Sequence, residues 1–216
     1  IRFAARAPGA PHAVAEVSWR RKFVDAVGQL WTPFAHARGD VYGYQNARNP
    51  DNVALAQADD TVTRGFGAVG MNYSYPLVAH TGTASHILEP TAQIIARPNR
   101  VDQRRLPNED AKSINYDDTL LFDIDKFSGF DRLETGTRAN VGLQYTFQAN
   151  TGLHTRLVFG QSFHLAGENA FANPGFDPST STGALANPRD SFSRFSGLET
   201  KSADYVAGLY MSPVAG

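Results

Sequence analysis

The chain contains no cysteine among its 216 residues. Within this chain, that absence excludes disulfide frameworks, thiolate metal sites and cysteine nucleophiles together. No apolar run approaches the roughly 18 residues that a transmembrane helix needs, so the sequence predicts no helical span. The formal net charge is −1, so bulk electrostatics implies no nucleic acid or other polyanion as a partner.

The chain contains runs in which apolar and polar residues alternate, and the connections between these runs alternate between short and long. Alternation with a period of two predicts β-strands. We expect a partial strand at 1–7 and full strands at 13–20, 29–43, 64–76, 85–97, 133–148, 152–164 and 203–212. The long connections are 44–62, 98–132 and 165–202, and the short ones include 77–84 and 149–151.

Antiparallel strands with short turns at one end and long loops at the other are the layout of an outer-membrane β-barrel. We therefore predict an all-β fold, an antiparallel transmembrane β-barrel of the outer-membrane type, present as a partial barrel of about seven to eight meandering strands. Because the chain starts at Ile1 without a methionine and directly in a strand pattern, we expect residues 1–216 to be part of a single barrel domain, truncated at both ends. A soluble β-sandwich, acting as a carbohydrate-binding module, is an open alternative, since its polar face would simply be the wet outside.

The two faces of the predicted strands differ in chemistry. One face is apolar, and we expect part of it to face lipid: Val69, Met71, Ala92, Ile94, Val141, Leu143 and Leu157. Aromatic residues gather at the short-turn ends, mostly on the apolar face: Trp19, Trp31, Tyr73, Tyr75, Tyr145 and Phe147. Such a cluster is typical of an interfacial girdle, and the alternative is the ordinary β-propensity of aromatics.

Several short matches to motifs of enzymes and metal proteins lack the secondary structure or the residue spacing that those motifs require. Residues 65–70 match G-x-G-x-x-G, but a strand pattern follows where a helix must begin, so these are glycines of a strand that permit close packing or curvature. Asp123, Asp125 and Asp131 resemble a calcium loop without its spacing, and a solvated acidic loop is the favoured interpretation. The histidines lack zinc-site spacing, and no Gly-x-Ser-x-Gly elbow is present. We therefore predict no catalytic residue, no metal site, no cofactor and no enzyme activity.

One stretch is more specific than the alternation. Residues 88–93 read Leu-Glu-Pro-Thr-Ala-Gln, and a long loop with 106–110, 115–117 and 122–123 follows. The segment 126–132, Lys-Phe-Ser-Gly-Phe-Asp-Arg, then leads into the strand pattern 137–143. This order resembles the barrel domain of the LptD family, the lipopolysaccharide-assembly or organic solvent tolerance proteins of Gram-negative outer membranes. The residues 160–163, Gly-Gln-Ser-Phe, also look like the next strand of that family.

The resemblance implies transport in the cell outer membrane: a translocon component that inserts lipopolysaccharide (LPS) into the outer leaflet while its saccharide passes the polar lumen. It also implies partners: LPS, membrane lipid, an outer-membrane lipoprotein plug of the LptE type, and a periplasmic bridge protein that binds through a domain outside this chain. Another outer-membrane porin or receptor channel is an open alternative. Its strands would show the same alternation and the same two faces, and only the motifs between 88 and 163 argue against it.

The polar face of the predicted strands carries the residues that would meet saccharide and phosphate groups in such a lumen. These candidates are Arg38, Glu89, Gln93, Arg138, Asn140, Gln144 and Arg156. Arginine suits phosphate because it can donate two parallel hydrogen bonds. The alternative for each residue is a charge in the lumen that pairs with a neighbour across the strands.

Overall fold

The computed structural model describes residues 2–6, 12–47, 58–99, 114–172 and 196–212. In these residues the protein is all-β, with ten antiparallel strands in one open sheet. The strands are β1 (Arg2–Arg6), β2 (His12–Arg20), β3 (Phe23–Val24), β4 (Leu30–Ala47), β5 (Ala58–Ser74), β6 (Leu77–His80), β7 (Ala84–Ala96), β8 (Thr137–Ala149), β9 (His154–Ala166) and β10 (Ser202–Ser212). The same residues contain no helix long and apolar enough to cross a membrane.

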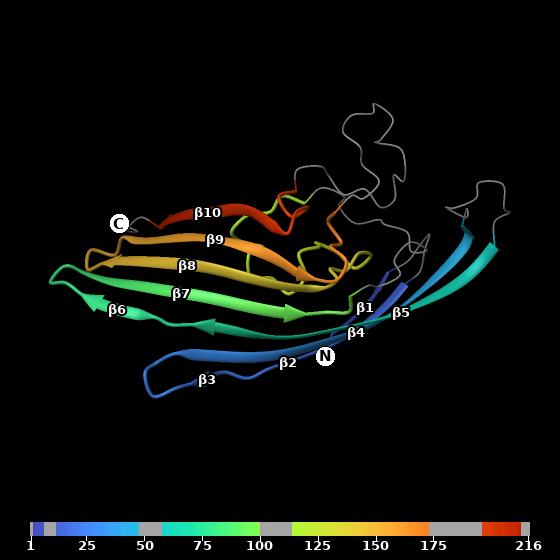
Figure 1. Ribbon diagram of the computed structural model, residues 1–216, viewed down its shortest axis with the longest axis horizontal. Helices are drawn as coiled ribbons and strands as arrows, with labels where there is room; N and C mark the ends of the chain where they lie inside the picture. The colour runs from blue at the N-terminus through green and yellow to red at the C-terminus, as the bar shows by residue number, and fades with distance from the viewer. Residues whose placement is uncertain (1, 7–11, 48–57, 100–113, 173–195, 213–216) are drawn as a thin grey trace, which may run out of the picture.

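The main strands pair in the order of the sequence, β1-β2-β4-β5-β7-β8-β9-β10. Each pair is antiparallel, so successive strands reverse direction and alternate connections fall at the same end of the sheet. Figure 1 shows the short turns together at the left end of the long sheet, while the strand ends that the long connections join lie at the right. The predicted meander is confirmed, and it is one open sheet rather than two packed sheets of a sandwich in the part of the chain that the structure describes.

The predicted strands are all present, with three corrections at their ends. The connection expected at 77–84 is mostly the strand β6, because Pro76 has no N–H for the ladder and divides one long strand into β5 and β6, which both pair with β7. The long connection expected at 44–62 is shorter, since β4 continues to Ala47 and β5 begins at Ala58. The strand expected from 133 begins at Thr137, directly after Gly136, whose φ of 77° is a left-handed conformation that an extended strand does not adopt.

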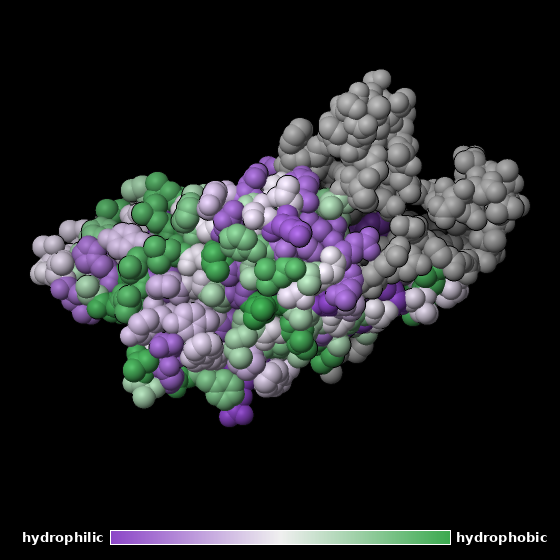
Figure 2. Space-filling model, viewed as in Figure 1, coloured by the Kyte–Doolittle hydropathy of each residue, from purple (hydrophilic) through white to green (hydrophobic). Residues whose placement is uncertain are grey.

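The two faces of the sheet separate as the alternation predicted. We call the face that bears the buried Phe34, Phe66 and Ile95 the inner face, and the opposite one the outer face. Large apolar side chains on the outer face are exposed, including Val69, which is 58% exposed. In the view of Figure 2, hydrophobic residues are spread over the strand region, and hydrophilic residues gather toward the end of the long connections.

The predicted aromatic girdle lies where the sequence placed it, at the short-turn ends of the strands. Trp31 and Tyr73 are register partners on β4 and β5, and their ring centroids are 4.6 Å apart. Trp19 is 54% exposed. The position is confirmed, and its role at a membrane interface remains a prediction.

Candidate functional site

The inner face is partly covered by the chain itself. Residues 114–136, which we call the inner loop, connect toward β8 and fold back onto the inner face. Two hydrophobic clusters hold the loop. In one, Leu133 packs among the buried Phe34, Phe66, Ala68 and Ile95 of the sheet, with the half-buried Ile124 against them. The other joins Ile114 and Phe127 to Phe171, Leu198 and Ala203 near the end of the long connections.

The middle of the inner loop docks on two arginines of the wall. The Phe130 carbonyl accepts hydrogen bonds from Arg38 of β4 and from Arg64 of β5, the latter at 2.5 Å. Both guanidinium groups are also paired with Asp40, at 2.6 Å for Arg38 and 2.5 Å for Arg64. The Arg38 guanidinium lies 4.9 Å from the centroid of the Phe130 ring. These arginines therefore hold protein rather than presenting free donors to a ligand.

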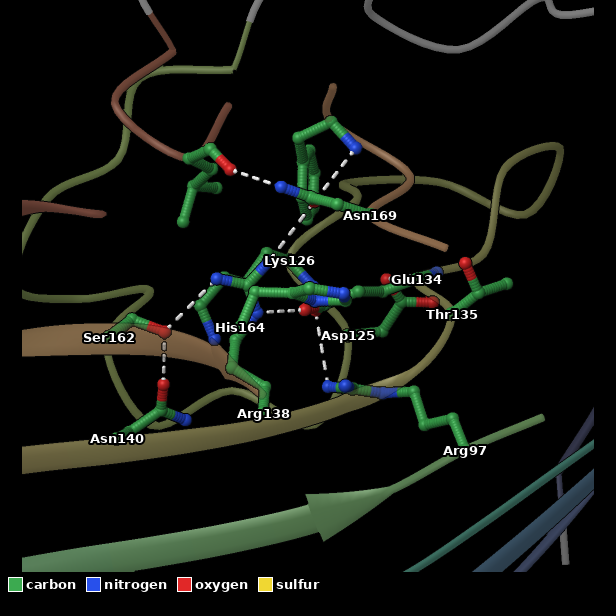
Figure 3. Close-up of polar contacts among 12 residues, drawn as sticks. Arg97, Asp125, Lys126, Glu134, Thr135, Arg138, Asn140, Ser162, His164 and Asn169 are labelled. Atoms are coloured by element: carbon green, nitrogen blue, oxygen red, sulfur yellow. Dashed lines mark hydrogen bonds and ion pairs between the residues drawn. The ribbon is translucent and has the colours of Figure 1, made fainter. Parts of the chain in front are cut away.

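The end of the inner loop is fixed by a buried ion cluster (Figure 3). Glu134 is fully buried and lies between two arginines, with Arg138 at 2.5 Å and Arg97 at 3.1 Å. Arg97 also donates to the Ile124 carbonyl. Lys126 is 1% exposed, and its ammonium has no hydrogen-bond partner among the described residues. The cluster thus gathers three basic groups around one buried carboxylate.

The electrostatics of this cluster shift its titrations. Burial favours the neutral form of Glu134, but Arg97, Lys126 and Arg138 outweigh it and lower the pKa of that carboxyl. Burial lowers the pKa of Lys126 to about 8. Burial, with the negative charge of Glu134, raises the pKa of Asp125 to about 7. The Asp125 carboxylate accepts from the backbone N–H groups of Phe127 and Glu134, at 3.0 and 3.3 Å.

A ladder of amide and hydroxyl groups continues from this cluster along the sheet. Gln93 donates to the Phe122 carbonyl at 2.8 Å, and Asn140 donates to Gln93 at 2.6 Å. Ser162 donates to Asn140 at 2.5 Å, and Arg138 donates to Ser162 at 3.3 Å. Because each of these groups is hydrogen-bonded to the next, the polar side chains on this part of the inner face find their partners within the protein.

Small residues in the wall make room for the loop. Gly142 of β8 and Gly160 of β9 are register partners, and Leu121 of the inner loop sits over both. A Cβ on Gly160 would overlap the Leu121 side chain, which is fully buried. On β10, a Cβ at Gly208 would overlap the Asp118 carboxylate. The glycines thus form a flat strip on which the loop docks.

Toward the short turns, the inner loop leaves part of the inner face open. A pocket of about 320 Å³ lies there between the wall and the start of the loop, and we call it the wall pocket. Its polar lining includes Lys22, Asn72, Glu89, Asp118, Gln144 and Arg156. Arg156 donates to Gln144 at 2.9 Å and lies 5.6 Å from the centroid of the Tyr210 ring.

The seven residues predicted to line a lumen all lie on the inner face, but the structure divides them. Glu89, Gln144 and Arg156 come together in the wall pocket. The other four are buried beneath or beside the inner loop: Arg38, Gln93, Arg138 and Asn140. The alternative of a charge paired across the strands holds for Arg38 only through Glu16 at 3.9 Å, since its shorter contact is with Asp40 of its own strand. Arg138 is paired with Glu134 of the inner loop, which is not a neighbour across the strands.

The inner loop was not predicted from the sequence, and two of its acidic residues lie in an environment other than the expected one. Asp123 is exposed, as in a solvated acidic loop, but Asp131 is 3% exposed and Asp125 is half-buried. Among the described residues, no group of three or more His, Asp or Glu side chains could hold a metal ion. Glu134 was read as the start of a strand. The glycines at inner-face positions of β8, β9 and β10 were the one local signal of a docked segment.

Comparison with known proteins agrees with this architecture. The family LptD, LPS transport system D, matches residues 2–216. No curated protein matches the chain with significance. Because the family match spans nearly the whole chain, the protein belongs to the LptD family, whose members are outer-membrane β-barrels and transport components of Gram-negative bacteria. Membership implies involvement in LPS transport to the outer membrane.

Proposed function

We propose that this LptD-family chain is part of the wall of a single outer-membrane barrel domain that inserts LPS into the outer leaflet. The saccharide portion passes along the polar inner face, while the lipid portion leaves sideways into the bilayer. The observation that carries the proposal is the separation of the two faces of one continuous sheet. Outer-face residues such as Ile94 and Val141 are exposed and apolar, whereas the inner face carries charged and amide groups.

The division of the inner face supports a particular route. Arg38, Gln93, Arg138 and Asn140 are engaged by the inner loop or by one another, so they meet no ligand while the loop is docked. Glu89, Gln144 and Arg156 line an open pocket. The proposed path of the saccharide therefore passes the short-turn half of this wall first, and the four covered residues position the loop beside that path.

The partners follow from the same role. LPS is the transported substrate, and membrane lipid covers the outer face. A lipoprotein plug of the LptE type occupies part of the lumen, and a periplasmic bridge protein delivers LPS through a domain outside this chain. In support of a plug, the inner face is still hollow beside the inner loop, where a second pocket of about 450 Å³ is lined by Glu16, Ser18, His36 and Gly129 among others. This role is transport, and we propose no catalytic residue and no cofactor.

Site-specific photo-cross-linking tests the proposal. A photoreactive amino acid replaces either Gln144 on the inner face or Val141 on the outer face of β8, in the full-length protein in living cells. We expect Gln144 to cross-link to LPS through its saccharide, and Val141 to cross-link only to the acyl chains of membrane lipid, LPS included. A lumen position that never cross-links to LPS during active transport would contradict the proposed route.

A further inference from the structure

The wall pocket has a balanced set of charges. Its lining contains two basic groups, Lys22 and Arg156, and two carboxylates, Glu89 and Asp118. Arg156 is engaged by Gln144, and Asp118 accepts a hydrogen bond from Tyr210 at 2.6 Å. A phosphate in this pocket would meet the ammonium of Lys22 and an arginine that is partly committed to Gln144, while facing two carboxylates of its own sign. The pocket therefore offers a phosphate no net positive charge, and like charges close together are unfavourable.

The uncharged groups of the pocket favour a different ligand chemistry. The side-chain oxygen of Asn72 is buried and has no hydrogen-bond partner among the described residues. Thr32, Ser74 and Thr91 add hydroxyl groups from three neighbouring strands. A buried acceptor without a donor is costly, so a ligand that brings hydroxyl donors is stabilised there.

The pocket also has an apolar side. Phe122 of the inner loop and Val158 of β9 line it together with the polar groups. Its volume of about 320 Å³ lies at the lower end of the range of about 300–1,000 Å³ typical of small-ligand pockets. A sugar ring matches this combination, because it presents hydroxyl groups around its edge and C–H groups on its faces.

We infer that the wall pocket is a discrete subsite for an uncharged, hydroxyl-rich sugar residue of the transported saccharide, rather than for a phosphorylated one. This inference rests on the proposed function and adds the chemical class that the pocket selects. In it, Glu89 and Asn72 accept hydroxyl protons of the sugar, and Arg156 is held in place by Gln144. The arginine-rich part of the wall is occupied by the inner loop, so phosphate recognition is not the task of this segment.

The inference is tested by cross-linking with three chemically defined probes. A photoreactive amino acid replaces Thr32, which lines the pocket, in the full-length protein purified in detergent with its outer-membrane partners. The probes are native LPS, chemically dephosphorylated LPS, and lipid A, which carries phosphate but lacks the further saccharide. We expect native and dephosphorylated LPS to cross-link equally well from Thr32, and lipid A to cross-link far less.

Loss of yield on dephosphorylation would overturn the inference. A pocket that binds phosphate through a charged group would lose about tenfold or more of its cross-linking at limiting probe, because hydrogen bonds to charged groups are among the stronger ones. Equal yields from lipid A and native LPS would overturn it too, because lipid A lacks the further saccharide.

Charge variants at Glu89 provide an internal control. Glu89→Gln and Glu89→Lys make the pocket more positive in two steps, and Glu89→Gln preserves the shape of the side chain. We expect preference for native over dephosphorylated LPS to appear in Glu89→Gln and to increase in Glu89→Lys. A wild-type pocket with the strongest phosphate preference of the three would contradict the assignment.

The design also separates this inference from the proposed function. A second photoreactive position at Thr146, on the inner face of β8 and outside both pockets, reports passage of LPS in general. Cross-linking at Thr146 without any at Thr32 would contradict the sugar subsite and leave the transport role intact. Absence of LPS adducts at both positions in active complexes would count against the transport route itself.

Discussion

Leu121 of the inner loop lies directly over Gly160 of β9, so closely that a Cβ on the glycine would overlap the leucine side chain. Leu121 is fully buried at this contact. The loop and the wall are thus fitted to each other at a position where neither side has spare volume. This fit makes the inner loop part of the barrel wall rather than a segment that rests loosely against it.

Gly160→Ala should therefore destabilise the folded protein. The added methyl group forces Leu121 away from the wall, and overpacking of this kind typically costs about 1–3 kcal/mol. The measurement is thermal unfolding of the full-length protein in detergent. Gly65→Ala is the matched control, because nothing lies within 4 Å of a Cβ placed there. Similar losses from both substitutions would show that the loop does not depend on the Gly160 contact.

Glu134→Gln should cost more than Gly160→Ala. The substitution keeps the shape of the side chain but leaves Arg97 and Arg138 buried without their carboxylate, and breaking a buried ion pair in this way typically costs about 3–5 kcal/mol. Unfolding by heat or urea measures the loss. Glu89→Gln is the control, since Glu89 has no ion pair in the described part of the chain and lies in an open pocket. If the two glutamine variants are equally stable, the cluster does not hold the loop.

The docking of the inner loop should weaken as pH rises through neutrality. The pKa of Asp125 is about 7 in the folded protein, above the value of about 3.9 in an unfolded chain. Its contribution to stability is therefore fully present below the unfolded pKa and is lost as pH rises through 7. The lowered pKa of Lys126, about 8, acts in the opposite sense, and only above that pH. Asp125 thus sets the expected trend between pH 5 and 7.

A cysteine at Thr135 can report this docking, because Thr135 is 3% exposed and the chain has no cysteine of its own. The rate of thiol labelling, relative to that of the unfolded protein at each pH, measures local opening. We expect relative labelling to be faster at pH 7.5 than at pH 5.5. In Asp125→Asn, which keeps the oxygen that accepts from Phe127 and Glu134, this pH dependence should largely disappear. An unchanged pH profile in the asparagine variant would assign the effect to another group.

The sequence predicted the faces of the strands correctly because alternation is a local signal. Successive residues of a strand point to opposite faces of the sheet, so the position of Arg38 or Gln144 in its strand places it on the inner face. A register shift of one residue would turn the apolar side chains of that strand to the inner face. The end of β5 near Pro76 was predicted, but the strand β6 was not, because the pattern does not show whether the chain resumes pairing after Pro76.

The inner loop could not be predicted by the same reasoning. Its contacts join residues far apart in the chain, such as Phe130 with Arg38 and Phe122 with Gln93. Docking also depends on the absence of side chains at Gly142 and Gly160, which alternation treats as neutral. As a result, the sequence did not separate the four candidates that are buried beneath or beside the inner loop from Glu89, Gln144 and Arg156, which line the wall pocket.

The outer face should tolerate charge far less than the inner face. Leu143 and Gln144 are adjacent in β8, and Leu143 is 42% exposed on the outer face while Gln144 lines the wall pocket. Leu143→Arg should cost about 2–4 kcal/mol if the position lies near the middle of the bilayer. Gln144→Arg should cost much less. The measurement is folding of the full-length protein into lipid vesicles followed by urea titration. Equal costs would contradict the assignment of the outer face to lipid.

The long connections should share the outer side of the membrane, and the short turns should face the periplasm. The strands alternate in direction, so connections 47–58, 96–137 and 166–202 begin and end at one end of the sheet, and outer-membrane barrels keep their short turns on the periplasmic side. Single cysteines introduced at Asn49, Asn108 and Ser181, which lie outside the described residues, report on which side of the membrane the long connections lie. A cysteine at Asn150, in the turn between β8 and β9, reports the other.

In intact cells, a membrane-impermeant thiol reagent should label the three long-connection cysteines but not the cysteine at Asn150. Labelling of Asn150 should require prior opening of the outer membrane, and the protein without added cysteines gives the background. The inner loop provides a further control. A cysteine at Thr135 belongs to the same connection as Asn108, yet Thr135 is buried. It should therefore label slowly from either side. Rapid labelling of Asn150 in intact cells, with the long connections silent, would invert the orientation and leave the short-turn half of the inner face, with its wall pocket, opening to the cell exterior.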